Sequence, residues 1–175
     1  MSPEDQVDSG TAKSLNLTDE ELLAILREGA EEVFMMLGAV GELVENEGLQ
    51  IAEGATSAAF IADIAYEVVV GFSGPLEGVV VMRCQESCAN SITRGMLMME
   101  EGEPVAQEDI RDALGECTNM LGGFFKRQAL DPTGTFQLGI PKIEEYVAAG
   151  NHTEQGSLVY ELSDSQASVE VWLGN

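Results

Sequence analysis

Two segments of this chain resemble one another at an offset of 84 residues, and this repeat constrains the fold more than any other feature. Glu32–Gly38 reads Glu-Val-Phe-Met-Met-Leu-Gly, and Glu116–Gly122 reads Glu-Cys-Thr-Asn-Met-Leu-Gly. Each segment has helical apolar spacing and precedes runs of β-type residues. A chance match between two amphipathic helices is the competing explanation for so short a repeat. We favour a duplicated half-domain in which the second copy has Asn119 where the first has Met35.

Three helices are predicted from apolar spacing and capping patterns. Thr18 and Glu21 form a capping box that starts the first helix, which runs from near Asp19 to around Gly38. A second helix is expected from about Glu86 to Met99. The third, from about Glu108 to Ala129, opens with acidic residues and closes with basic ones, which suits the helix dipole.

The predicted strands lie between and after these helices. The turn Ser73–Pro75 joins the first two strands as a hairpin. Weaker strands near Gln50–Glu53 and Ile140–Tyr146 are interrupted by Gly and Pro. We therefore expect an α+β fold in which a mostly antiparallel sheet packs with three main helices in pseudo-duplicated halves. The four stronger runs are Ile64–Phe72, Leu76–Arg83, Leu158–Leu162 and Val169–Leu173.

Length and composition favour one folded domain after a short tail. Residues 1–16 are polar and lack periodicity, so we expect a disordered N-terminal tail. Residues 17–175 are long enough for a single core, since 45% of the chain is hydrophobic. The chain contains neither a signal-peptide pattern nor an apolar run of about 20 residues, so we expect a cytoplasmic protein.

The charge balance and the cysteines exclude several classes of function. Acidic residues outnumber Lys and Arg by 31 to 8, and the resulting charge of −23 would repel nucleic acids and anionic membranes. We expect neither as a partner. Cys84, Cys88 and Cys117 are an odd number and are expected as free, buried thiols. His152 is the only histidine, so a tetrahedral zinc shell cannot be completed and no metal site is expected.

Glu116 and Asn119 form the only Glu-x-x-Asn pair in the chain and lie one helical turn apart in the third predicted helix. The pair projects onto the side opposite the apolar stripe, together with Gly115, Gly122, Gly123 and Lys126. Each glycine destabilises a helix interior by about 1 kcal/mol, which favours a surface that a partner approaches closely. Two alternatives remain open at this point. The glycines could serve close packing within the protein, and an exposed Glu and Asn could be ordinary solvated residues.

The segment Asp112–Gly123 and the upstream hairpin Phe72–Val81 resemble the CheC, CheX and FliY chemotaxis phosphatases, and most closely the single-motif CheX branch. The resemblance extends over about Leu22–Leu173. It implies a phosphatase that hydrolyses the phospho-aspartate of a CheY-type response regulator. It also implies that Asn119 orients the attacking water and that Glu116 pairs with the regulator's lysine, while the glycines and Lys126 contact the partner.

The same resemblance implies no cofactor in this chain, because Mg²⁺ would be held by the regulator. It also implies a homodimer formed through sheet edges, for which the strands of Leu158–Leu173 are the expected place. Two alternatives are a non-catalytic adaptor related to flagellar-switch proteins, and a structural domain whose third helix is buried by another subunit.

Overall fold

The computed structural model of this protein describes residues 15–37, 41–43, 63–130, 134–144, 152–162 and 165–174. Nearly all of the expected tail at residues 1–16 lies outside these ranges. The weak strand expected at Gln50–Glu53 lies outside them as well.

The three expected helices are present, with small differences at their ends. They are α1 (Asp19–Met36), α2 (Glu86–Leu97) and α3 (Gln107–Phe125). The capping box at the start of α1 is confirmed, since the Glu21 backbone N–H donates to Thr18 Oγ1 and the Thr18 N–H donates to the Glu21 carboxylate. The second helix ends earlier than expected because Met98 adopts a left-handed conformation with φ of 53°.

The strands form one antiparallel sheet in the order β1-β6-β7-β3-β2-β4, with β5 also pairing with β2. The predicted hairpin is confirmed as β2 paired with β3 across the Ser73–Pro75 region. The expected strand at Ile140–Tyr146 is present as β5, while Tyr146 is outside the described residues. The strands are β1 (Gly41–Leu43), β2 (Tyr66–Ser73), β3 (Gly78–Cys84), β4 (Gln137–Leu138), β5 (Lys142–Glu144), β6 (His152–Leu162) and β7 (Ser165–Gly174).

The connectivity of the sheet has the symmetry that a duplicated half-domain requires. The hairpin β2–β3 and the hairpin β6–β7 meet at the pairing of β3 with β7. The strand that follows α1 pairs with β6 of the second half, and the strands that follow α3 pair with β2 of the first half. The strands that follow the helix of each half therefore pair with a strand of the other half.

The structure shows which of the two strands within Leu158–Leu173, where a dimer edge was expected, lies inside the sheet. The strand at Val169–Leu173 belongs to β7, which pairs with β3 on one side and β6 on the other, so it cannot be an edge. The neighbouring β6 pairs with β1 at Tyr160–Leu162 as well as with β7. The apolar pattern of a strand does not show from sequence alone whether that strand lies in the centre of a sheet or at its edge.

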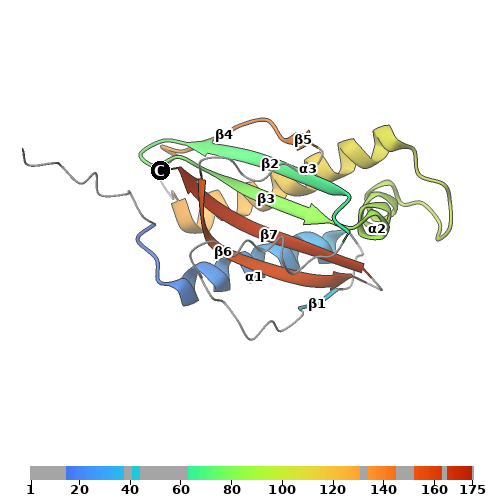
Figure 1. The fold of residues 1–175 in the computed structure, drawn as a ribbon, viewed down its shortest axis with the longest axis horizontal. Helices are drawn as coiled ribbons and strands as arrows, with labels where there is room; N and C mark the ends of the chain where they lie inside the picture. The colour runs from blue at the N-terminus through green and yellow to red at the C-terminus, as the bar shows by residue number, and fades with distance from the viewer. Residues whose placement is uncertain are drawn as a thin grey trace, which may run out of the picture.

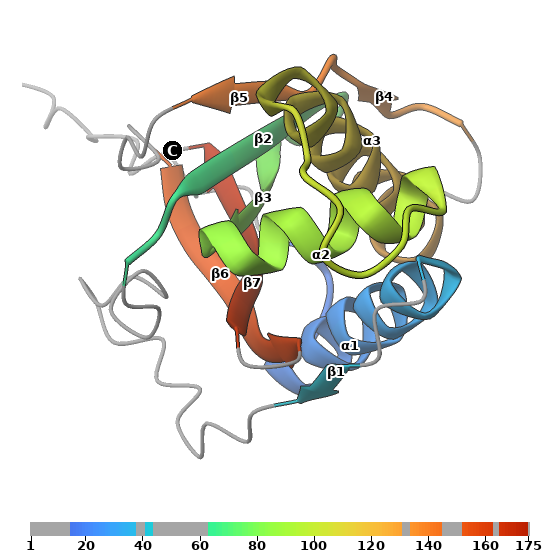
Figure 2. The same cartoon turned by 90° about the vertical axis from the view of Figure 1, so that its right-hand side faces the viewer.

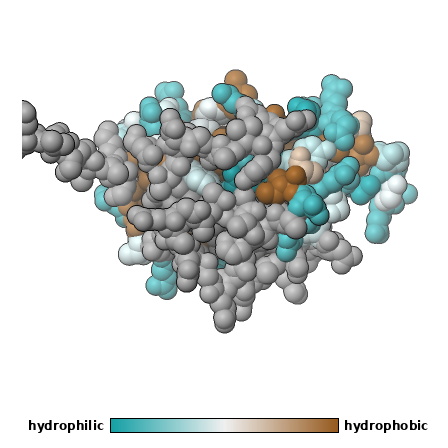
Figure 3. All heavy atoms as spheres, in the orientation of Figure 1, coloured by the Kyte–Doolittle hydropathy of each residue, from teal (hydrophilic) through white to brown (hydrophobic). Residues whose placement is uncertain are grey.

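The helices cover one face of the sheet, as Figures 1 and 2 show. α1 and α3 lie side by side against the sheet, and α2 crosses near its end. The core between these layers includes Phe72, whose ring centroid lies 5.9 Å from that of Phe125 and 6.4 Å from that of Phe136. On the outside, Figure 3 shows a mainly hydrophilic described surface with a few separate hydrophobic groups. The fold thus leaves the outer sides of α1 and α3 available to solvent.

Candidate functional site

The site is built on α3, which contacts the sheet, α1 and α2 at once. Its inward stripe is buried as expected and includes Ile110, Leu114, Cys117 and Leu121. Thr118 is also buried, and its hydroxyl donates to the Leu114 carbonyl at 2.8 Å. This bond satisfies the hydroxyl within the helix. Cys117 and Thr118, the two residues between Glu116 and Asn119, therefore lie away from the outward face.

Glu116 and Asn119 lie on the outward side of α3. Glu116 is exposed and Asn119 is half-buried. Residues three apart on a helix are neighbours on one face, so the carboxylate and the amide can be presented together. The sequence-based placement of this pair is therefore consistent with the fold.

Gly115 and Gly122 are not on the outward side, contrary to the expectation from helical projection. Both are buried, and a Cβ added at Gly122 would lie 3.4 Å from Val70 Cγ1 on β2. A Cβ at Gly115 would lie 3.7 Å from Pro141 Cβ. The projection failed because α3 is covered on two sides, by the sheet below and by the strand edge beside it. Gly122 faces β2 and Gly115 faces the segment after β4, and a Cβ at either position would make ordinary van der Waals contact there.

Gly123 and Lys126 are half-buried on the side of α3 that carries Asn119. A Cβ at Gly123 would lie 3.7 Å from Nη1 of Arg127, whose guanidinium carbon lies 5.7 Å from the ring centroid of Phe124. From Lys126 to Leu130 the helix widens into a π-helical turn. Such turns are rare and often occur near functional sites. Two basic residues thus lie at the end of α3, beyond the Glu116 and Asn119 pair.

The family model for the chemotaxis phosphatase CheX matches residues 66–155, about half of the chain, and the match includes all of α3. The chain belongs to the CheX family. No curated protein sequence matches it.

Solved structures similar to this CheX-family protein carry the same fold at low sequence identity. CheX from Vibrio vulnificus matches with a TM-score of 0.67 and 16% identity, covering 90% of this chain and 99% of that one. CheX from Borrelia burgdorferi, solved in complex with CheY, BeF3 and Mg²⁺, has a TM-score of 0.58 and 16% identity over 88% of this chain and 98% of that one. FliY from Thermotoga maritima matches with a TM-score of 0.56 and 17% identity, covering 90% and 91%. These likenesses establish the α+β fold.

The three thiols of this CheX-family protein are free and buried, as expected. They lie in the core beneath α3, where Cys117 Sγ is 3.8 Å from Met82 Sδ. Burial raises the pKa of the Cys117 thiol far above its usual range. A hydrogen bond with Cys88, followed by burial, raises the pKa of Cys84 as well. Because the thiolate is the reactive form, Cys84 and Cys117 are packing residues.

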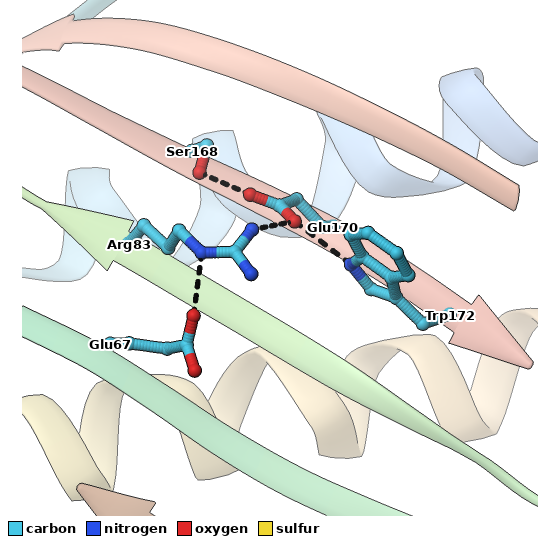
Figure 4. A network of polar contacts seen from close by, with 5 residues as sticks. All are labelled: Glu67, Arg83, Ser168, Glu170 and Trp172. Atoms are coloured by element: carbon cyan, nitrogen blue, oxygen red, sulfur yellow. Dashed lines mark hydrogen bonds and ion pairs between the residues drawn. The ribbon is translucent and has the colours of Figure 1, made fainter. Parts of the chain in front are cut away.

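A buried ionic network that the sequence analysis did not identify lies on the sheet face opposite the helices (Figure 4). Arg83 donates to Glu67 at 2.7 Å and also to Glu170, and these three side chains are at most 3% exposed. Glu170 accepts further hydrogen bonds from Ser168 at 2.7 Å and Trp172 at 2.8 Å. Burial lowers the pKa of Arg83, but the two carboxylates outweigh it, so the pKa is raised overall. Because the face carrying these residues is turned away from α3, we assign the network a structural role.

Strand pairing is the pattern that could have identified this network. Glu67 lies directly opposite Arg83 in the β2–β3 register, and Arg83 lies opposite Ser168 on β7. Opposite charges at directly paired positions stabilise a sheet. In the described residues, no group of three His, Cys, Asp or Glu side chains could hold a metal ion. No helix in these same ranges is long and apolar enough to cross a bilayer.

Proposed function

We propose that this protein hydrolyses the phospho-aspartate of a CheY-type response regulator. The observation that carries the proposal is the outward position of Glu116 and Asn119 on α3 in a member of the CheX family. Support comes also from the Borrelia burgdorferi CheX, a protein of the same fold that was solved in complex with CheY.

Asn119 is assigned to the attacking water. Phosphoryl transfer is catalysed mainly by positioning and by electrostatic stabilisation. A side-chain amide can accept one hydrogen bond from a water and donate another, and so can hold the water in line with the phosphorus. The half-buried environment of Asn119 restricts its rotamers, which favours such positioning.

Glu116 is assigned to a cation of the regulator. A carboxylate would repel the phosphoryl group, but it forms a strong, charge-assisted hydrogen bond with an ammonium group. Pairing with the regulator's active-site lysine would anchor α3 in the partner's pocket. In this proposal the Mg²⁺ belongs to the regulator, and this protein supplies only the water-positioning amide and the anchoring carboxylate.

Residues beside Glu116 and Asn119 on α3 are also part of the proposed contact with the regulator. Lys126 and Gly123, half-buried on the same side of α3, are proposed to contact the regulator. A basic side chain here would reduce the repulsion between a protein of charge −23 and an acidic phospho-acceptor pocket. We also propose a cytoplasmic homodimer, the form expected from the family resemblance.

The decay of phosphorylated regulators tests this function. Receiver domains from the same cell are phosphorylated with a small phosphodonor, and their phosphate loss is followed with and without catalytic amounts of the protein. We expect a large acceleration for at least one regulator. If every regulator decays at its own rate, but one of them binds, the protein is a non-catalytic adaptor of the kind represented by the flagellar-switch relatives.

A further inference from the structure

The edge strand beside α3 contains a β-bulge. On β2, Val69 and Phe72 are three positions apart, while their partners Lys142 and Leu138 are four apart. One extra residue therefore lies in the segment Gly139–Pro141, between β4 and β5. Bulges occur at sheet edges and next to active sites, where they redirect a side chain.

This bulged segment runs alongside the helix turn that carries Glu116 and Asn119. Leu138 packs near Gly122, and Pro141 packs near Gly115. The two glycines are about 10 Å apart along the helix axis, and Leu138 and Pro141 are about 10 Å apart along an extended chain, so the two segments run antiparallel and match in length. Ile140 consequently lies level with the turn between Glu116 and Asn119.

The angular positions around α3 place Asn119 closest to the segment. At about 100° per residue, Asn119 lies about 40° around the helix from Gly115, and Glu116 about 100°. This agrees with the half-buried state of Asn119 and the exposed state of Glu116. The bulged segment is thus a wall along one side of the polar pair.

Ile140 is 85% exposed on this wall. Pro and Lys on an edge strand are usual means of preventing strand addition, and Pro141 and Lys142 fit that role. Single exposed apolar side chains are common on protein surfaces, and Ile140 is distinguished from the others by its place on the segment beside Glu116 and Asn119.

We propose that Ile140 is an apolar docking contact for the phosphorylated receiver domain and sets the affinity for it. This inference rests on the proposed function, because a receiver that admits Glu116 and Asn119 into its pocket must cover the wall beside them. Burying this side chain on association would remove apolar surface from water and would strengthen binding without entering the chemical step.

The test compares Ile140→Thr with the wild-type protein. Threonine keeps the β-branched shape that suits an edge strand and removes the apolar end of the side chain. We expect about a tenfold increase in KM for the phosphorylated receiver, with kcat unchanged. The same increase is expected in the Kd for a receiver domain activated with beryllofluoride and Mg²⁺. Ile140→Leu should stay within about twofold of wild type.

Met98→Asn is a matched control, because Met98 is 93% exposed at the end of α2 and asparagine tolerates its left-handed conformation. It should leave KM and Kd unchanged, and all variants should unfold at the wild-type temperature. Wild-type KM and Kd for Ile140→Thr would overturn the docking role while leaving hydrolysis intact. Binding that depends on Ile140 without any hydrolysis would retain the docking role and refute the proposed function. Absence of any receiver binding by the wild-type protein would overturn both.

Discussion

α1 and α3 lie side by side against one face of the sheet and bury equivalent positions of the 84-residue repeat, yet they expose different chemistry. The exposed Glu32 of α1 corresponds to Glu116, but Met35, which is 76% exposed, occupies the position of Asn119. The pairs buried in both helices include Leu26 with Ile110, Ala30 with Leu114, Val33 with Cys117 and Leu37 with Leu121. Both copies therefore share the packing side of the helix and the exposed glutamate, and only the second copy has the complete Glu and Asn pair.

The two helices also differ in how their backbones are stabilised. α1 begins with a complete capping box, whereas α3 begins at Ala106, whose side chain offers no hydrogen bond. α3 contains three glycines in its interior and ends in a π-helical turn. The capping box therefore stabilises the start of α1. In α3 local stability is lower, and its close fit to the sheet and to the edge strand positions the polar pair.

Exchanging Asn119 and Met35 between the two helices should have the largest effect on function. The double variant Asn119→Met with Met35→Asn moves the amide from α3 to α1, beside Glu32. We expect the acceleration of regulator dephosphorylation to fall by about 100-fold or more. On α1 the counterpart of Gly115 is Glu31, which is exposed, so within the described part of the chain no wall lies beside the transplanted amide.

Met35→Asn alone is the control for this exchange and should keep the wild-type rate. An exchange variant that retained more than about a tenth of the wild-type acceleration would show that Glu-x-x-Asn on either helix is sufficient. The comparison between the two halves would then lose its functional meaning.

A smaller effect is expected from repairing the start of α3. Ala106 has φ of −76° and ψ of 148°, the extended conformation of an N-cap residue. Ala106→Ser should supply the missing acceptor and raise the free energy of unfolding by about 1 kcal/mol, measured by urea denaturation. Thr18→Ala, the mirror change on α1, should lower it by a similar amount.

Hydrolysis should be unaffected by Ala106→Ser, because residue 106 lies nearly three turns before Glu116. If the free energy of unfolding did not change, the backbone N–H groups in the first turn of α3 would already have other hydrogen-bond acceptors. A loss of hydrolysis with gained stability would instead indicate that the site depends on movement of this helix.

Much of the fold could be predicted because it depends on local patterns. Apolar spacing and the Thr18 capping box located α1, and the Ser73–Pro75 turn located the β2–β3 hairpin. The repeat indicated two halves, and the sheet order has that symmetry. These features follow from residues that are close together in the chain.

The errors arose where distant segments meet. Gly115 and Gly122 were assigned to the outward face because the edge strand that packs against them was weakly predicted. The network of Glu67, Arg83 and Glu170 was missed because its members come from three strands. The docking wall at Ile140 depends on a one-residue register difference, which no property of a single segment reveals.

Asn119 is proposed to act in the chemical step and not in docking. Single-turnover decay of a phosphorylated receiver, measured against increasing excess of wild-type protein or Asn119→Ala, tests this most directly. We expect both proteins to bind the beryllofluoride-activated receiver with a similar Kd. At saturating Asn119→Ala the decay rate should stay close to the receiver's own, at least about 100-fold below the rate with the wild-type protein. A saturating rate equal to that of the wild-type protein would contradict it.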